Sequence, residues 1–163
     1  MQTIRRQAAI AAAAALLSLC AAGCKVNVDR GAKHHPIQAT AEDLQQVEAE
    51  SIRVIFELDN GRYGEVWDQS APYLKQSIDR PGFERTLQMA KKLVGPRGAR
   101  TRGEPVFEAD PPGLPRGRYA AYANGIECGK EACIEKIVLQ QQQPGGDWKL
   151  AGYHVNKKID LLR

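Results

Sequence analysis

The spacing of apolar residues divides the chain after residue 40 into a helical half and a strand-forming half. In the first half, apolar side chains recur every three or four residues, which is the period of an amphipathic helix. The first helical segment begins at Thr40, which forms a capping box with Asp43, and ends at Gly61, which suits a left-handed turn. Its predicted inward face consists of Leu44, Val47, Ser51, Val54, Ile55 and Leu58.

Two more helical segments are predicted before residue 97. Pro72 has no amide hydrogen, so it either kinks the second segment or begins a new one. One side of that second segment carries Tyr63, Val66, Trp67, Ser70, Leu74 and Ile78. The third opens at residues 79–81 and closes at Gly95 and Pro96. Its predicted inward residues are Phe83, Leu87, Ala90 and Val94.

The period then changes from that of a helix to that of a strand. Strands are predicted over residues 101–108, 117–127, 133–142 and 148–156, the first of them interrupted by a glycine and a proline. Helices followed by a run of antiparallel strands define an α+β domain. We therefore expect a single domain over residues 40–163, with its N-terminal helices packed on one face of a curved antiparallel sheet.

Three motifs in this domain resemble a family of bacterial envelope proteins known as domain of unknown function 4019. They are residues 56–63 with Trp67 just after, residues 114–119 and residues 146–153. The resemblance covers about residues 45 to 155 and implies the cone-shaped fold of nuclear-transport-factor-2-like (cystatin-like) proteins. The family brings no established activity, so the resemblance implies no catalytic residues.

The first 23 residues have the three parts of a secretory signal peptide. Residues 1–6 are short and positive, residues 8–19 are apolar, and the small residues Ala21, Ala22 and Gly23 precede Cys24. This order is typical of a segment that is cut off after export, and its apolar run is too short to span a bilayer.

The same residues resemble the lipobox of bacterial lipoproteins, although Ala21 stands where leucine is usual. The resemblance implies cleavage before Cys24 and acylation of Cys24 by palmitate-type chains, which anchor the protein to the periplasmic face of a membrane. Lys25 follows the cysteine, and by resemblance to bacterial sorting rules this favours the outer membrane. The alternative is ordinary secretion after Gly23, with Cys24 a free thiol. Residues 24–39 are predicted to form a flexible tether.

Charge and composition give no reason to expect nucleic acid, a metal or a cofactor. The chain has 23 Lys and Arg and 19 Asp and Glu, and without Arg5 and Arg6 of the signal the charge is 21 − 19 = +2. This near-neutral charge does not predict nucleic-acid binding, which requires a concentrated basic surface. His34 and His35 have no third ligand nearby, so we expect no metal, and we expect no cofactor.

Cys128 and Cys133 are predicted to form a disulfide, because both remain in an oxidising compartment after Cys20 leaves with the signal. Residues 129–132 between them suit a hairpin loop. If the two cysteines face each other, Tyr122 lies opposite Leu139 and Ile126 opposite Glu135. A redox-active pair and a metal site are the rival interpretations. The C-x4-C spacing is not that of a redox motif, and no second ligand pair exists for zinc.

Aromatic residues supply the candidate binding surface. The candidate pocket-lining residues are Tyr63, Trp67, Tyr122 and Tyr153. A cone-shaped fold places some aromatics around a pocket between helices and sheet, and this pocket would take a small apolar ligand or a segment of an envelope protein. The competing interpretation is that such residues fill the core.

Two classes of function remain open from the sequence. The first is a non-catalytic binding or assembly module, and the second is a small isomerase-type or hydrolase-type enzyme. Asp59, Glu65 and Asp68 are the acids that would serve as a general base, although one lies in a turn and two on a solvated helix face. No nucleophile elbow, phosphate loop or HExxH zinc motif is present. A buried carboxylate facing an enclosed pocket favours the enzyme, whereas a filled core with exposed acids favours the binding module.

Overall fold

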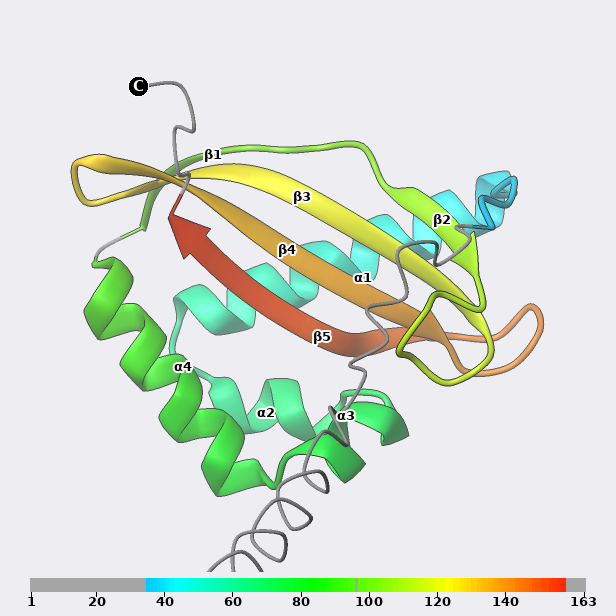
Figure 1. The fold of residues 1–163 in the computed structure, drawn as a ribbon, viewed down its shortest axis with the longest axis horizontal. Coiled ribbons are helices and arrows are strands. Elements are labelled where there is room, and N and C mark those ends of the chain that lie inside the picture. Colours follow the sequence, from blue (N-terminus) through cyan, green and yellow to red (C-terminus); the bar gives the residue numbers. More distant parts are fainter. Residues whose placement is uncertain (1–34, 96, 158–163) are drawn as a thin grey trace, which may run out of the picture. The chain divides into compact units, whose positions relative to one another are not determined.

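The computed structural model describes residues 35–95 and 97–157. Within them the chain forms four helices and then five strands (Figure 1). These are α1 (Ala41–Asp59), α2 (Tyr63–Asp68), α3 (Pro72–Ser77), α4 (Arg80–Val94), β1 (Arg97–Thr101), β2 (Val106–Ala109), β3 (Arg118–Cys128), β4 (Glu131–Gln141) and β5 (Trp148–Lys157). The predicted α+β class is confirmed. The expected signal peptide, Cys24 and the first part of the tether lie outside the described residues.

The start of α1 is fixed by the predicted capping box. Thr40 Oγ1 accepts a hydrogen bond from the Asp43 amide at 3.0 Å, and Asp43 Oδ2 accepts one from the Thr40 amide at 3.0 Å. The prediction that Leu44 points inward is wrong, because its side chain is 45% exposed. The buried face of α1 is rotated toward Asp43 and Glu57, which are buried because Arg118 and Arg53 neutralise them.

Pro72 begins a separate helix, which was one of the two predicted outcomes. The break between α2 and α3 is tied to the sheet, since the Ala71 amide donates to the Leu150 carbonyl at 2.8 Å. At the start of α4, Asp79 caps the helix by accepting from the Gly82 amide at 2.9 Å. Phe83 and Leu87 are buried as predicted.

The sheet is antiparallel throughout, with strand order β1-β3-β4-β5, and β2 also pairs with β3. The single strand predicted over residues 101–108 is therefore wrong. The chain divides at Gly103, where any Cβ would clash with the Ala123 carbonyl oxygen. The Gly103 amide instead donates to Asn124 Oδ1 at 3.2 Å, so the break is part of the pairing with β3.

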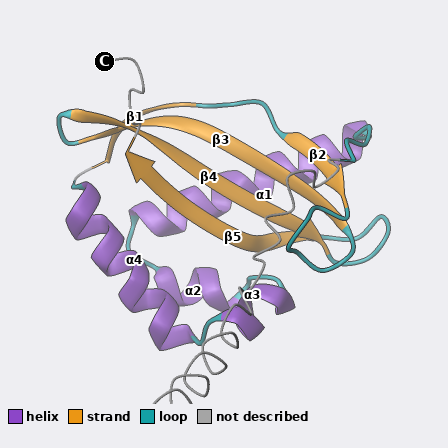
Figure 2. Cartoon of the chain, viewed as in Figure 1, coloured by secondary structure: helices purple, strands orange, loops and turns teal. Residues whose placement is uncertain are grey.

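The helices pack against the curved sheet and close the core between the two layers. Figure 2 shows α1 passing behind the strands, while α2, α3 and α4 lie along the β5 side. The central core cluster joins α1, α2 and α4 to the inward residues of β2, β3, β4 and β5. Near the C-terminal end of the expected tether (residues 24–39), the Ile37 amide donates a hydrogen bond to the Phe107 carbonyl of β2 at 3.2 Å. Ile37 and Ala39 also pack against this core.

The predicted β3–β4 register is wrong by two residues. Tyr122 lies opposite Ile137, and Ile126 opposite Cys133. The cause is the turn, which contains the two residues Gly129 and Lys130 instead of four. A shift of two residues leaves every side chain on its predicted face, so the same inward residues reach the core.

The predicted disulfide between Cys128 and Cys133 is present. The two residues are diagonal neighbours across the hairpin, with a Cα–Cα distance of 5.9 Å, and both are buried. They close the small cluster formed with Ile126, on which Val94 and Val155 pack.

Replacing both cysteines, as in Cys128→Ala/Cys133→Ala, is expected to lower the free energy of unfolding by about 2 kcal/mol, because the bond closes a short loop. Urea denaturation of the oxidised protein and the variant measures this difference. Intact-mass analysis of the oxidised protein provides the control, since it should lack two hydrogens at this pair. Alkylation of both thiols without prior reduction would contradict the assignment.

Candidate functional site

A carboxylate that is completely withdrawn from water lies in the middle of β4. Glu135 is 0% exposed and faces the same side of the sheet as Cys133 and Ile137. An unpaired charge in such a place is very costly, so it requires cationic partners. Arg100 Nε lies 2.7 Å from Glu135 Oε2, and Arg97 Nη1 lies 3.8 Å from Oε1.

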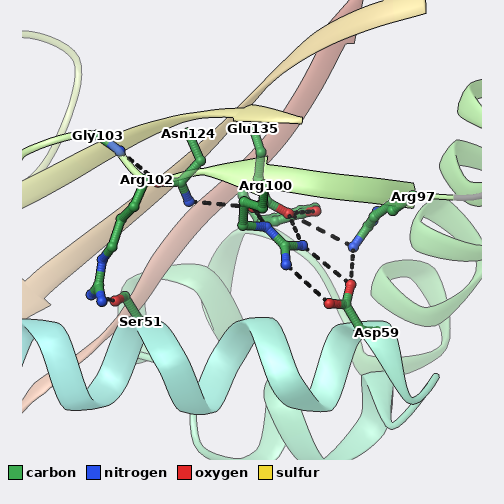
Figure 3. A network of polar contacts seen from close by, with 9 residues as sticks. Ser51, Asp59, Arg97, Arg100, Arg102, Gly103, Asn124 and Glu135 are labelled. Atoms are coloured by element: carbon green, nitrogen blue, oxygen red, sulfur yellow. Dashed lines mark hydrogen bonds and ion pairs between the residues drawn. The ribbon is translucent and has the colours of Figure 1, made fainter. Parts of the chain in front are cut away.

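A second carboxylate completes the charge balance. Asp59, the last residue of α1, lies 3.2 Å from Arg97 and 3.1 Å from Arg100 (Figure 3). Burial alone would lower the pKa of Arg100, but its hydrogen bonds to Asp59 and Glu135 raise that pKa above the ordinary value. The two arginines and two carboxylates therefore form a charged cluster with no net charge.

Two uncharged side chains donate further hydrogen bonds to the carboxylate oxygens of Glu135. The Tyr153 hydroxyl donates to Oε1 at 2.7 Å, and Asn124 Nδ2 donates to Oε2 at 3.3 Å. Burial, followed by the negative charge of Glu135, raises the pKa of Tyr153 far above its ordinary value. Tyr153 is thus held as a protonated donor.

The Glu135 carboxylate is saturated by these contacts. Arg100 donates to both of its oxygens, and Tyr153 and Asn124 donate to one each. A general base needs a free lone pair within reach of the proton that it removes. We interpret the cluster as a structural tie that joins α1, β1, β3, β4 and β5.

The sequence reasoning did not single out Glu135 as a functional candidate. The signal was present, because Glu135 alternates with Cys133, Ile137 and Leu139 on the predicted inward face of its strand. A charged residue in that register predicts a buried carboxylate, and the arginines at 97 and 100 supply its partners.

The three acids considered as general bases are not brought together. Asp59 belongs to the charged cluster. Glu65 and Asp68 have side chains that are about half exposed, and each pairs with one arginine, at 3.7 Å to Arg62 and 3.1 Å to Arg80.

The four candidate pocket-lining aromatics lie in or against the core. Tyr63 and Tyr122 are 7% and 3% exposed, and Trp67 and Tyr153 are partly buried and pack against the same cluster. Trp67 Nε1 donates to the Ile78 carbonyl at 3.0 Å. The structure therefore uses these side chains for packing, while Tyr63 also borders a surface hollow near the start of α4.

A different apolar surface lies beside the charged cluster, and we call it the α1–β1 hollow. It has a volume of about 380 Å³ and is lined by Ile52, Ile55, Phe56, Asp59, Arg100 and Arg102. Ile52 is 51% exposed and Phe56 is 58% exposed, so two large apolar side chains of α1 meet solvent together at this surface. The Arg62 guanidinium stacks over the Phe56 ring at 5.0 Å.

The charges that border the hollow are already paired. Arg100 belongs to the charged cluster, and Arg102 lies 2.9 Å from Glu48 and donates to Ser51 Oγ at 2.9 Å. Arg102 also lies over the Tyr122 ring at 5.1 Å. The hollow therefore presents apolar atoms between compensated charges.

In the described part of the chain, no three His, Cys, Asp or Glu side chains gather as a metal site would need. No described helix is long and apolar enough to cross a membrane.

Comparison with protein families matches residues 50–153 to the family described as "Protein of unknown function (DUF4019)". The match covers more than half of the 163 residues, so the chain belongs to this family. Comparisons with curated proteins and with solved structures gave no match.

Removing the buried carboxylate, as in Glu135→Ala, is expected to lower the free energy of unfolding by about 3 kcal/mol, because two partly buried arginines lose a partner. The control is Glu131→Ala on the same strand, whose ion pair with Lys157 is more than half exposed on both sides. That variant should change stability by less than about 0.5 kcal/mol. Equal urea midpoints for the two variants would show that the cluster is not a structural tie.

Proposed function

We propose that the protein is an exported, lipid-anchored binding module that docks a partner protein of the cell envelope through the α1–β1 hollow. The observation that carries the proposal is the exposure of Ile52 and Phe56 beside the charged cluster. Exposed apolar residues that gather on one surface mark sites of interaction, whereas isolated ones need no explanation.

The depth of the hollow favours a protein over a small molecule. Sites for small ligands enclose most of the surface of the ligand. Here the two main apolar walls are each more than half exposed, so a ligand of that size would stay in contact with water. Apolar side chains of a partner protein would cover both walls at once.

The residue types around the hollow are those that contribute most at protein interfaces. Aromatic residues and arginines are enriched at such surfaces and carry much of the binding energy. Phe56, with Arg62 stacked on its ring, is the central anchor of the proposed interface. Arg100 and Arg102 line the same hollow. Because both bordering arginines are paired internally, the partner segment is expected to be apolar and uncharged.

Support for a non-catalytic role comes from the state of the acids. Glu135 and Asp59 are neutralised by arginines, and Glu65 and Asp68 are solvated. None of these groups is an available base beside the hollow. Support for export and anchoring comes from the signal pattern of residues 1–23 and from Cys24 at its end.

Cys24→Ser is expected to abolish acyl labelling and to release the protein in soluble form, because the anchor is then lost. Metabolic labelling with an alkyne fatty acid, followed by membrane fractionation, measures both effects. Ser18→Ala, within the apolar part of the signal, provides a matched control that leaves the cysteine in place. Unchanged membrane retention of the Cys24→Ser protein would reject the anchor, and fractionation with the inner membrane would reject only the outer-membrane location.

Docking through the hollow is tested by a photoreactive phenylalanine analogue placed at Ile52 in living cells. We expect a defined crosslinked partner from this position and none from the same analogue at Lys130, which lies at the hairpin turn. Adding Phe56→Ser should reduce the crosslink by about tenfold or more, because the loss of a hot-spot anchor costs about 2 kcal/mol.

Phe56→Ser is expected to leave folding nearly unchanged, since the ring is mostly exposed. Protein abundance and the urea midpoint check this point. The proposal fails if Ile52 yields no crosslink, or if a folded and abundant Phe56→Ser protein crosslinks as before.

A further inference from the structure

A second surface of unusual composition lies on the solvent side of α4. Phe83 and Leu87 fill the inward side of the helix. On the outward side, Arg85, Met89 and Lys92 follow at helical spacing, with Leu93 beside them. Leu93 is 76% exposed, the highest value among the exposed large apolar residues, and Met89 is 63% exposed, the same as Val106.

The positive charges of this face are not compensated within the described residues. The acidic residue nearest in sequence, Glu84, is paired with Arg80 at 3.3 Å. Arg85, Lys91 and Lys92 take part in none of the ion pairs of the described chain. This distinguishes α4 from the α1–β1 hollow, where each arginine has an acidic partner.

Exposed apolar side chains between free basic residues are complementary to an anionic lipid surface. Each lysine or arginine is attracted to the headgroups, and the apolar side chains enter the boundary with the acyl chains. Two apolar residues are too few to hold a soluble protein on a membrane. They suffice to orient a protein that is already held there by another anchor.

The length of chain between Cys24 and His35 permits this orientation. Eleven residues span at most about 40 Å when fully extended. A domain of this size has a radius of gyration of about 14 Å. An anchor at Cys24 therefore leaves the face of α4 within reach of the bilayer.

We infer that the outward face of α4, formed by Arg85, Met89, Lys92 and Leu93, docks on an anionic lipid surface and sets the orientation of the anchored domain. This inference rests on the proposed anchoring at Cys24. The α1–β1 hollow is lined by no residue of α4, so α4 docks on the bilayer while the hollow stays available to its partner protein.

Met89 supplies a probe that needs no substitution, because Met1 leaves with the signal and Met89 is the one methionine that remains. The mature chain, beginning at Cys24, is coupled through that thiol to a maleimide lipid in vesicles. One set contains phosphatidylcholine alone, and the other contains phosphatidylcholine and phosphatidylglycerol in equal parts. Hydrogen peroxide, which is uncharged and therefore equally concentrated near both surfaces, oxidises exposed methionine to its sulfoxide.

We expect Met89 to be oxidised about fivefold more slowly on the anionic vesicles than on the neutral ones at low salt, and the difference to disappear at high salt. Arg85→Gln/Lys92→Gln should abolish the difference. Lys130→Gln/Lys136→Gln, which removes the same charge from exposed positions on β4 and its turn, should keep it. Mass spectrometry of the peptide that contains Met89 gives the rates.

Equal oxidation on the two kinds of vesicle would overturn the inference, and so would equal sensitivity of the two double variants. Because the coupling is chemical, this result does not depend on whether cells acylate Cys24. Failure of the anchor in the labelling experiment and failure of α4 docking on vesicles are therefore separate outcomes.

Discussion

The burial of one carboxylate, that of Glu135, constrains the arrangement of the elements around it. A charge on the inward face of a central strand is stable only where cations reach it. Arg97 and Arg100 supply that charge from β1, and they in turn need Asp59 at the end of α1 to balance them. These ion pairs connect β1, which pairs with β3 in the sheet, to the end of α1.

The same requirement explains the irregular form of β1. The pairing of β1 with β3 is interrupted between Arg97 and Arg100, and a bulge of this kind redirects side chains. Here both guanidinium groups point inward to the carboxylates (Figure 3). Inward charges and bulges also protect an exposed edge strand from pairing with other chains. The charged cluster therefore stabilises the wall of the α1–β1 hollow, and it also protects the β1 edge of the sheet from pairing with another chain.

Most of the fold could be predicted from local rules, and the errors have physical causes. The capping box at Thr40 and the opening of a helix at residues 79–81 depend on neighbouring residues, so the sequence shows them directly. Pro72 fits either a kink or a new helix, and only the structure decides for the new helix. The β3–β4 register depends on how many residues the turn takes, which the spacing of two cysteines did not determine. The separation of β1 from β2 depends on a close approach to Ala123, a contact between distant residues that no local pattern contains.

The candidate site was hidden for a related reason. Periodicity identifies the residues that face inward, and it selected aromatics such as Tyr122, which the structure uses for packing. The residues that distinguish the surface are apolar side chains on the outward faces of amphipathic helices: Phe56 on α1, and Met89 and Leu93 on α4. In the sequence alone they look like irregularities in a pattern. They become informative once the inward faces are known to be filled, because folding then gives no reason for their apolar character, and contact with another surface gives one.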